Sequence, residues 1–321
     1  MLCYVKRILV TGGAGFIGSN FIHFLFSEEA REYGEFRISV LDDLTYAGRF
    51  ENIGMFVESG LVRFEKCDVR NLDAVRKCVA DADIVIHMAA ESHVDRSIEF
   101  PTIFAETNII GTLNVLMAVK EFGARLILVS TDEVYGSLET DFATEEYPLK
   151  PSSPYSASKA SADLMALAFH KTFSLDLVIT RCSNNYGKMQ FPEKLIPVII
   201  TNLAANKKVP IYGEGKNVRD WIHVLDHCSG ILAAAINGKS GEIYNFGDVD
   251  VLSNIDLVRK ILNLMGKGID SIEYVEDRKG HDFRYAIDSS KAKKQLGWNP
   301  KRNIDSSLEE IIDWYLENNS I

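Results

Sequence analysis

Two acidic residues follow a buried run of the sequence, at a point where proton chemistry is possible. Residues 130–137 read STDEVYGS, which places Asp132 and Glu133 next to Thr131 at the end of an apolar segment. Adjacent carboxyl groups in a closed cleft repel each other, so one keeps its proton while the other ionises. Such a pair can supply both a general acid and a general base. Two solvated acids at the start of a loop are the alternative.

A tyrosine and a lysine share one face of a predicted helix. Tyr155 and Lys159 are four residues apart, and Ser153 with Pro154 predicts an N-cap and a first turn before them. A free tyrosine has a pKa of about 10, and a nearby ammonium group favours the phenolate. We therefore expect Tyr155 to take a proton from a substrate hydroxyl while hydride leaves the carbon. An ordinary helical pair is the alternative.

A glycine-rich turn follows the first predicted strand. The run VTGGAGFIGS places Gly12, Gly15 and Gly18 three residues apart, and the next strand ends at Asp42, 24 residues after Gly18. Glycines let the backbone approach a pyrophosphate at a helix N-terminus. A carboxylate at Asp42 can accept both ribose hydroxyls and repels a 2′-phosphate, so the pattern predicts NAD rather than NADP. A simple turn with a solvent-facing acid is the alternative.

The order of apolar and amphipathic runs predicts the fold. Continuous apolar strands separated by helices are typical of a parallel sheet covered on both faces. We therefore expect an α/β fold with a Rossmann-type doubly wound parallel sheet. The predicted strands cover 7–11, 37–42, 62–68, 83–90, 125–131, 175–182 and 242–246, and the predicted helices cover 19–34, 72–81, 107–123, 153–174 and 225–238.

The rhythm changes after Cys182. Turn-rich pieces with Arg, Asn, Lys and Tyr follow, and they predict a smaller substrate-binding lobe interleaved with the sheet. We expect an NAD-binding Rossmann domain over 1–182 plus about 222–248. The second lobe is expected to combine 183–221 with 249–321.

Composition excludes several classes of function. The chain has 321 residues with 35 basic and 45 acidic side chains, a formal charge of −10, which argues against nucleic acid and anionic membranes as partners. It does not exclude an anionic small molecule. Five cysteines without a CxxC pair predict reduced thiols in a cytoplasmic protein. Histidine spacing predicts no metal site, and neither a transmembrane run nor a signal peptide is expected.

These motifs together resemble the extended short-chain dehydrogenase/reductase family. Additional runs, LDDLTYAG, AAESHVDRS, ETNIIGT, RCSNNYG, FPEKLIP, VRDW and DRKGHDFRYAID, make residues 7 to 315 similar to the dTDP-glucose 4,6-dehydratases of that family. The resemblance implies NAD as the cofactor, a nucleoside diphosphate-glucose as the substrate and a 4-keto-6-deoxy sugar nucleotide as the product. It also implies a homodimer formed through the helices at 107–122 and 156–173.

Rival functions remain open at this point. A sugar-nucleotide 4-epimerase or decarboxylase has the same fold, although such enzymes usually lack the Thr-Asp-Glu triplet. A non-catalytic NAD-binding protein would not need Thr131, Asp132, Glu133, Tyr155 and Lys159 together.

The resemblance implies a role for each matching residue. Asp132 is the implied acid and Glu133 the implied base. The implied catalytic set is Thr131, Asp132, Glu133, Tyr155 and Lys159. The implied cofactor-binding set is Gly12, Gly15, Phe16, Ile17, Gly18, Asp42, Asp43, Leu44, Thr45, Asp68, Val69, Ala89, Ala90, Ser92, Thr107, Ser130, Tyr155, Lys159 and Asn185. The implied substrate-binding set is Ser92, Thr131, Asn184, Lys194, Leu195, Pro210, Tyr212, Arg219, Asn254, Arg278 and His281.

Two segments depart from the family pattern. Relatives often read NNYGPYHFPEK where this chain has Lys188, Met189 and Gln190, and many read DRPGHD where it has Lys279. We expect both changes to lie near the nucleotide end of the substrate. The choice between thymidine and uridine therefore stays open.

Overall fold

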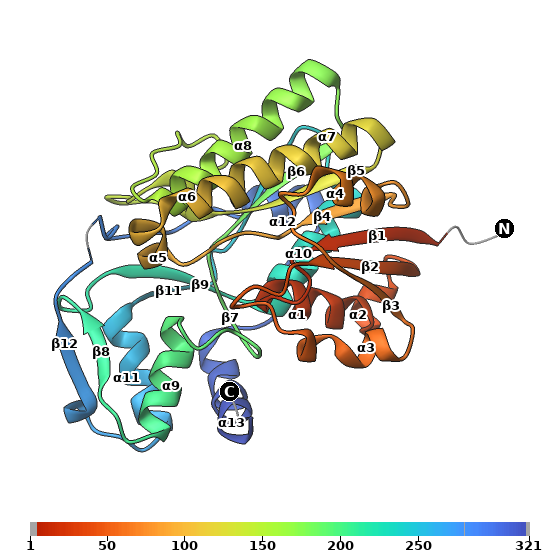
Figure 1. Cartoon of the computed structure of the whole chain (residues 1–321). Helices are drawn as coiled ribbons and strands as arrows, with labels where there is room; N and C mark the ends of the chain where they lie inside the picture. The colour runs from red at the N-terminus through yellow and green to blue at the C-terminus, as the bar shows by residue number, and fades with distance from the viewer. Residues whose placement is uncertain (1–4, 279, 319–321) are drawn as a thin grey trace.

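A seven-stranded parallel sheet forms the centre of the computed structural model, which describes residues 5–278 and 280–318 (Figure 1). Its strand order is β10-β6-β5-β4-β1-β2-β3, and each neighbouring pair is parallel. The predicted doubly wound sheet is confirmed. The strands are β1 Lys6–Thr11, β2 Phe36–Asp42, β3 Val62–Lys66, β4 Ile84–His87, β5 Arg125–Thr131, β6 Leu177–Cys182 and β10 Ile243–Phe246.

Helices cover both faces of this sheet because successive strand residues point to opposite sides. Ile8 and Val10 pack in the core on one face, whereas Leu9 packs in the core on the other. Figure 1 shows the two helical layers above and below the strands. The helices of the large lobe are α1 Phe16–Leu25, α2 Glu28–Arg31, α3 Gly54–Glu58, α4 Leu72–Val79, α8 Pro154–Phe173, α10 Val224–Asn237 and α12 Ser290–Leu296.

One predicted helix contains an irregular section. The stretch predicted over 107–123 consists of η2 Ala105–Gly111, a π-helical segment that continues α6 Pro101–Phe104, and α7 Thr112–Phe122. The π-helical segment carries Asn108, whose Nδ2 donates to the Glu91 carbonyl at 3.0 Å and to Ser158 Oγ at 2.8 Å. Wide turns of this kind are frequent at functional sites. Here the segment ties α8 to the loop after β4.

The run Pro101–Phe122 is the one helix of the described residues that is long and apolar enough to cross a membrane. Half of its most apolar window is buried inside the protein, where it packs against α8 and α4. It is therefore a core helix of the layer above the sheet.

A smaller lobe lies beside the carboxyl ends of the strands (Figure 1). It has its own core, in which Ile199, Leu257 and Ile311 are buried together. Its elements are α5 Val94–Glu99 at its border, the mixed sheet of β7 Asn184–Tyr186, β9 Val218–His223 and β11 Asp250–Ser253, the pair β8 Val209–Tyr212 and β12 Ile272–Val275, and the helices α9 Leu195–Ala204, α11 Asn254–Leu264 and α13 Ile304–Glu317. The described residues also contain short 3₁₀ turns, which are η1 Phe50–Asn52, η3 Asp132–Tyr135 and η4 Ile269–Ser271.

The chain crosses between the two lobes several times. Leu296 and Trp298 belong to the segment 249–321, which was predicted for the second lobe. Both pack in the core of the large sheet, where Trp298 contacts Phe246. The division into 1–182 plus 222–248 and 183–221 plus 249–321 stays a prediction.

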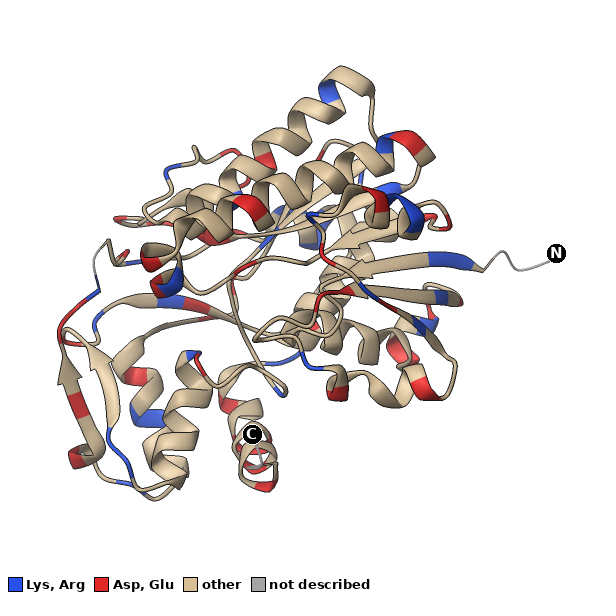
Figure 2. Cartoon of the chain, viewed as in Figure 1, with Lys and Arg blue, Asp and Glu red and all other residues tan. Residues whose placement is uncertain are grey.

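Charged residues of both signs are interspersed over both lobes (Figure 2). Among the described residues, no cluster of three His, Cys, Asp or Glu side chains has the arrangement of a metal site. Cys67, Cys78, Cys182 and Cys228 are free thiols.

Candidate active site

A cavity of about 330 Å³ runs along the carboxyl ends of the central strands. Parallel sheets of this type bind their ligands at that edge. Of the predicted cofactor-binding residues, Leu44 alone does not line this cavity. The residues that do are Gly12, Gly15, Phe16, Ile17, Gly18, Asp42, Asp43, Thr45, Asp68, Val69, Ala89, Ala90, Ser92, Thr107, Ser130, Tyr155, Lys159 and Asn185.

The glycine turn brings the backbone of β1 close to α1 and to the loop after β4. Gly12 has φ +72°, and a Cβ atom there would lie 2.7 Å from the Ala89 nitrogen. A Cβ atom on Gly18 would lie 2.1 Å from the Gly12 carbonyl oxygen. The N-cap of α1 is Gly15, which provides no capping side chain. Its uncapped N–H groups fit an anion such as the pyrophosphate of a dinucleotide.

Asp42 ends β2 as the sequence predicts and is buried. Its Oδ2 accepts from the Ala14 N–H at 2.9 Å, and its Oδ1 accepts from the Leu44 N–H at 2.8 Å. Burial raises the pKa of Asp42, and these two backbone N–H groups lower it. Each carboxylate oxygen keeps a second lone pair. The residues present therefore fit a ribose with two free hydroxyls.

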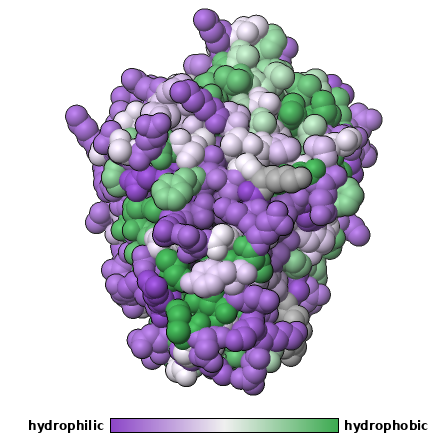
Figure 3. All heavy atoms as spheres, turned by 90° about the vertical axis from the view of Figure 1, so that its left-hand side faces the viewer, coloured by the Kyte–Doolittle hydropathy of each residue, from purple (hydrophilic) through white to green (hydrophobic). Residues whose placement is uncertain are grey.

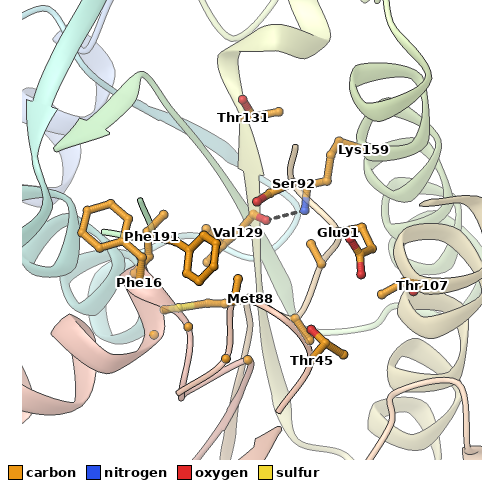
Figure 4. A pocket seen from close by; sticks show the side chains of 18 of the residues that line it. Phe16, Thr45, Met88, Glu91, Ser92, Thr107, Val129, Thr131, Lys159 and Phe191 are labelled. Atoms are coloured by element: carbon orange, nitrogen blue, oxygen red, sulfur yellow. Dashed lines mark hydrogen bonds between the residues drawn. The ribbon is translucent and has the colours of Figure 1, made fainter. Parts of the chain in front are cut away.

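Helix α8 begins where the sequence predicts and carries the tyrosine and the lysine into the cavity. Ser153 forms a capping box with Ser156, and Pro154 follows in the first turn. Tyr155 and Lys159 are both buried and line the cavity. Lys159 Nζ donates to the Val129 carbonyl at 2.8 Å (Figure 4). The ammonium is thus fixed to β5, and the pair shares one face of the helix.

The net shift of the Tyr155 pKa is upward, and the contribution expected from Lys159 stays a prediction. Burial and the Glu133 carboxylate raise the pKa of Tyr155 well above its usual value. Burial lowers the pKa of Lys159, whose ammonium is held by Val129. The largest cause of each shift is burial, which disfavours the charged form of each side chain.

The two acids lie directly after β5. Thr131 caps the 3₁₀ turn η3: its Oγ1 accepts from the Glu133 N–H at 3.3 Å and donates to Asp132 Oδ1 at 3.3 Å. Burial and the neighbouring Glu133 raise the pKa of Asp132 well above its usual range. Burial also raises the pKa of Glu133, while Lys194 and Arg219 lower it. Burial thus favours the protonated form of both carboxyl groups and more strongly that of Asp132, the direction that its predicted role as the acid requires.

A second cavity of about 380 Å³ lies between the lobes and meets the first one. Residues that line both cavities are Ser92, Glu133, Asn184, Glu193 and Lys194. Except for Thr131, which lines the first cavity, every predicted substrate-binding residue lines the second. These are Ser92, Asn184, Lys194, Leu195, Pro210, Tyr212, Arg219, Asn254, Arg278 and His281.

Ion pairs and aromatic rings shape the second cavity. Arg278 makes a two-point contact with Asp95, with Nε 2.5 Å from Oδ1 and Nη2 2.7 Å from Oδ2. The same guanidinium lies over the Tyr212 ring at 5.1 Å. Arg219 Nη2 donates to the Asp282 carbonyl at 3.0 Å and packs on Tyr285. Sequence reasoning missed Asp95 and Tyr285, although both lie in motifs that carry the resemblance.

The sequence also missed several residues of the first cavity and misplaced one segment. Met88, Glu91, Gln190 and Phe191 line it without having been predicted. Gln190 faces the cofactor cavity rather than the nucleotide end of a substrate, and its Nε2 donates to the Asn185 carbonyl at 2.9 Å. Whether this departure affects the choice of base stays a prediction. Lys279, the other departure, lies outside the described residues.

Comparisons with known proteins agree with this geometry. The family model described as GDP-mannose 4,6 dehydratase matches residues 9–311. The chain is 47% identical over 315 residues to the dTDP-glucose 4,6-dehydratase of Streptomyces antibioticus, covering 97% of this chain and 93% of that protein. The chain belongs to the extended short-chain dehydrogenase/reductase family.

Solved structures of this family share the whole architecture. A dTDP-glucose 4,6-dehydratase from Streptomyces venezuelae with NAD bound has a TM-score of 0.95 and 45% identity, covering 98% of both chains. The UDP-glucose 4-epimerase of Thermus thermophilus in complex with NAD has a TM-score of 0.88 and 29% identity, covering 98% of this chain and 100% of that one. Because both reactions occur on one fold, site chemistry must separate them.

Proposed function

We propose that the chain is an NAD-dependent dTDP-glucose 4,6-dehydratase, which removes water from the sugar nucleotide and leaves a 4-keto-6-deoxy sugar. One observation carries the proposal: the acids Asp132 and Glu133 lie beside Tyr155 where the two cavities meet. The identity of about 45% to dTDP-glucose 4,6-dehydratases supports it.

The first step uses the residues of the cofactor cavity. A dinucleotide bound there would supply the hydride chemistry of the reaction, from C4 of the sugar to C6. Tyr155 takes the proton of the C4 hydroxyl in the same step. Lys159, held by the Val129 carbonyl, places its positive charge on the face of α8 that carries Tyr155. Gly12, Gly15, Gly18 and Asp42 hold the dinucleotide.

The second step uses the adjacent acids. A ketone at C4 makes the C5 proton acidic, and Glu133 removes it. Asp132 gives its proton to the C6 hydroxyl, which leaves as water. The pKa shifts support this division, because Arg219 and Lys194 favour the ionised form of Glu133 while Asp132 is buried beside a second carboxyl.

The test is the fate of a label at C4. Purified protein is incubated with dTDP-glucose that carries deuterium at C4, and the product is examined by mass spectrometry and NMR. A dehydratase yields a product lighter by one water, with deuterium at C6 and solvent hydrogen at C5. Deuterium at C4 of an epimerised sugar without mass loss indicates an epimerase, whereas a decarboxylase, which needs a carboxylate at C6, leaves dTDP-glucose unchanged.

We further propose that two copies of the chain pair through the outer face of η2, α7 and α8, in a cytoplasmic enzyme. Ile110, Leu164 and Phe173 are 48%, 58% and 46% exposed on these helices. Apolar residues gather at the top of Figure 3, and α7 and α8 lie at the same height in Figure 1. A Leu164→Glu variant should lower the mass measured by light scattering from that of a dimer to that of a monomer.

A further inference from the structure

A cluster of four side chains joins three separate segments at the rim of the cofactor cavity. This rim cluster consists of Tyr46 from the loop after β2, Arg96 from α5, and Phe191 and Glu193 from the loop before α9. Tyr46 Oη donates to Glu193 Oε1 at 3.0 Å. The Tyr46 ring meets the Phe191 ring edge-on at 5.5 Å, and the Arg96 guanidinium lies over the Tyr46 ring at 3.7 Å.

The position of the cluster follows from the residues around it. Thr45 and Ala47 line the cofactor cavity on either side of Tyr46 in the sequence, whereas Tyr46 itself does not line it. Phe191 and Glu193 line the same cavity. Figure 4 shows Thr45 and Phe191 on different sides of the cavity. The contacts of Tyr46 with Phe191 and Glu193 therefore join the two loops at the edge of the cavity, while the Tyr46 side chain stays outside the cavity.

Further contacts brace this bridge against both lobes. Arg96 Nη1 lies 3.5 Å from Glu91 Oε2, and Glu91 is buried in the cavity wall. Lys194 Nζ donates to the Ser92 carbonyl at 2.9 Å, next to Glu193. Tyr46 is 37% exposed, so its ring contributes little to the core of either lobe. The cluster is thus a small set of contacts whose main effect is to hold the loops at 43–49 and 187–194 together.

The role that we infer for the rim cluster rests on the proposed function, in which the same bound dinucleotide is needed for two successive hydride transfers. Reduced cofactor that left after the first hydride transfer would strand the sugar at the keto stage, because the second transfer needs the same hydride. We propose that the rim cluster retains the dinucleotide between the two half-reactions, with Tyr46 as its central positioning residue. Opening the cavity then requires breaking the contacts of Tyr46 with Phe191, Glu193 and Arg96.

The experiment measures cofactor retention directly, with NAD as the probe. Wild type, Tyr46→Ala and Tyr46→Phe are purified, their bound NAD is quantified after denaturation, and exchange of bound NAD with radiolabelled NAD is timed. Tyr46→Ala should exchange NAD roughly 10- to 100-fold faster and purify with less of it, because such contacts act mainly on dissociation rates. Tyr46→Phe keeps the ring contacts and should lie between.

Tyr274→Ala is the matched control, since Tyr274 is 57% exposed on β12 and lines neither cavity. It should retain NAD like wild type. Exchange at the wild-type rate in Tyr46→Ala with an unchanged circular dichroism spectrum would overturn the inference. If wild type fails to dehydrate dTDP-glucose, the proposed function fails, while the exchange rates still decide whether the rim cluster retains NAD.

Discussion

The two cavities are built in different ways. The cofactor cavity is lined by loops that follow consecutive strands of one sheet. Its key contacts involve backbone atoms: the glycine turn, the N–H groups that donate to the Asp42 carboxylate and the Val129 carbonyl that accepts from Lys159. The second cavity is lined by side chains from many segments, with Arg219 and Arg278 held by aromatic rings and carbonyl or carboxylate oxygens. Glu133 lines both.

This contrast separates what each cavity tolerates. One added atom can block a close approach of the backbone and so weaken binding in the first cavity. In the second cavity, a substitution removes the contacts of one side chain and leaves the others in place. Substitutions in the first cavity should therefore change NAD binding, those in the second should change the KM for the sugar nucleotide, and those at the junction should change the chemical step.

The largest effect is expected at the junction. Asp132→Asn and Glu133→Gln keep shape and remove one proton-transfer group each, so water loss should slow about 10²–10⁴-fold. Oxidation at C4 should persist, because Tyr155 is intact, and should appear as NADH absorbance in a stopped-flow experiment. Glu139→Gln, an exposed change in the same loop, should behave as wild type. Full turnover in either junction variant would contradict the acid–base assignment.

In the cofactor cavity, Gly18→Ala should weaken NAD binding. The new Cβ would meet the Gly12 carbonyl oxygen at 2.1 Å, a contact that only a backbone shift relieves. Overpacking of this kind costs about 1–3 kcal/mol, which corresponds to roughly 5- to 150-fold in an equilibrium constant. Calorimetric titration with NAD measures it. Gly54→Ala is the matched control, because its Cβ would have no neighbour closer than 3.4 Å. Equal NAD affinity in both variants would refute the role of the turn.

In the second cavity, Arg278→Gln should raise the KM for the sugar nucleotide by about tenfold, because a charged hydrogen bond to a diphosphate is lost. Bound NAD should not change, and kcat should change little. Steady-state kinetics and NAD content together test the separation. Arg259→Gln removes an exposed ion pair on α11 and should alter neither. A loss of NAD in Arg278→Gln would show that the two cavities are not independent.

The prediction with the smallest effect at neutral pH concerns a buried histidine. His227, whose Nδ1 lies 2.9 Å from Asn185 Oδ1 in the wall of the cofactor cavity, is buried, and burial lowers its pKa from 6.5 to about 3. Between pH 6.5 and about 3, His227 is protonated in the unfolded chain and neutral in the folded protein. The free energy of unfolding therefore falls as pH drops from about 6.5 toward 3. His227→Leu should flatten this slope by about 1.4 kcal/mol per pH unit. Denaturant unfolding at several pH values measures it, and an unchanged slope would count against the buried neutral histidine.

Local pattern determined much of this protein. The strands of the large sheet, the glycine turn, Asp42 at the end of β2 and the start of α8 at Pro154 all follow from spacing along a short stretch of chain. Such features depend on hydrophobic period and backbone freedom, which neighbouring residues set. The residues of the second lobe were predicted only through the family resemblance, because no local period brings Asn184, Arg219 and Arg278 together.

Only the tertiary structure decided the electrostatics and the long-range contacts. The spacing of Tyr155 and Lys159 placed both side chains on one face of a helix, but the net upward shift of the Tyr155 pKa comes first from burial, which is a property of the whole fold. The pairing of Asp95 with Arg278 joins residues 183 positions apart. Gln190 lines the cofactor cavity in a loop that contacts α13, where Tyr315 Oη donates to the Gln190 carbonyl at 2.6 Å. Sequence sets which groups are present, and packing sets their charge and their partners.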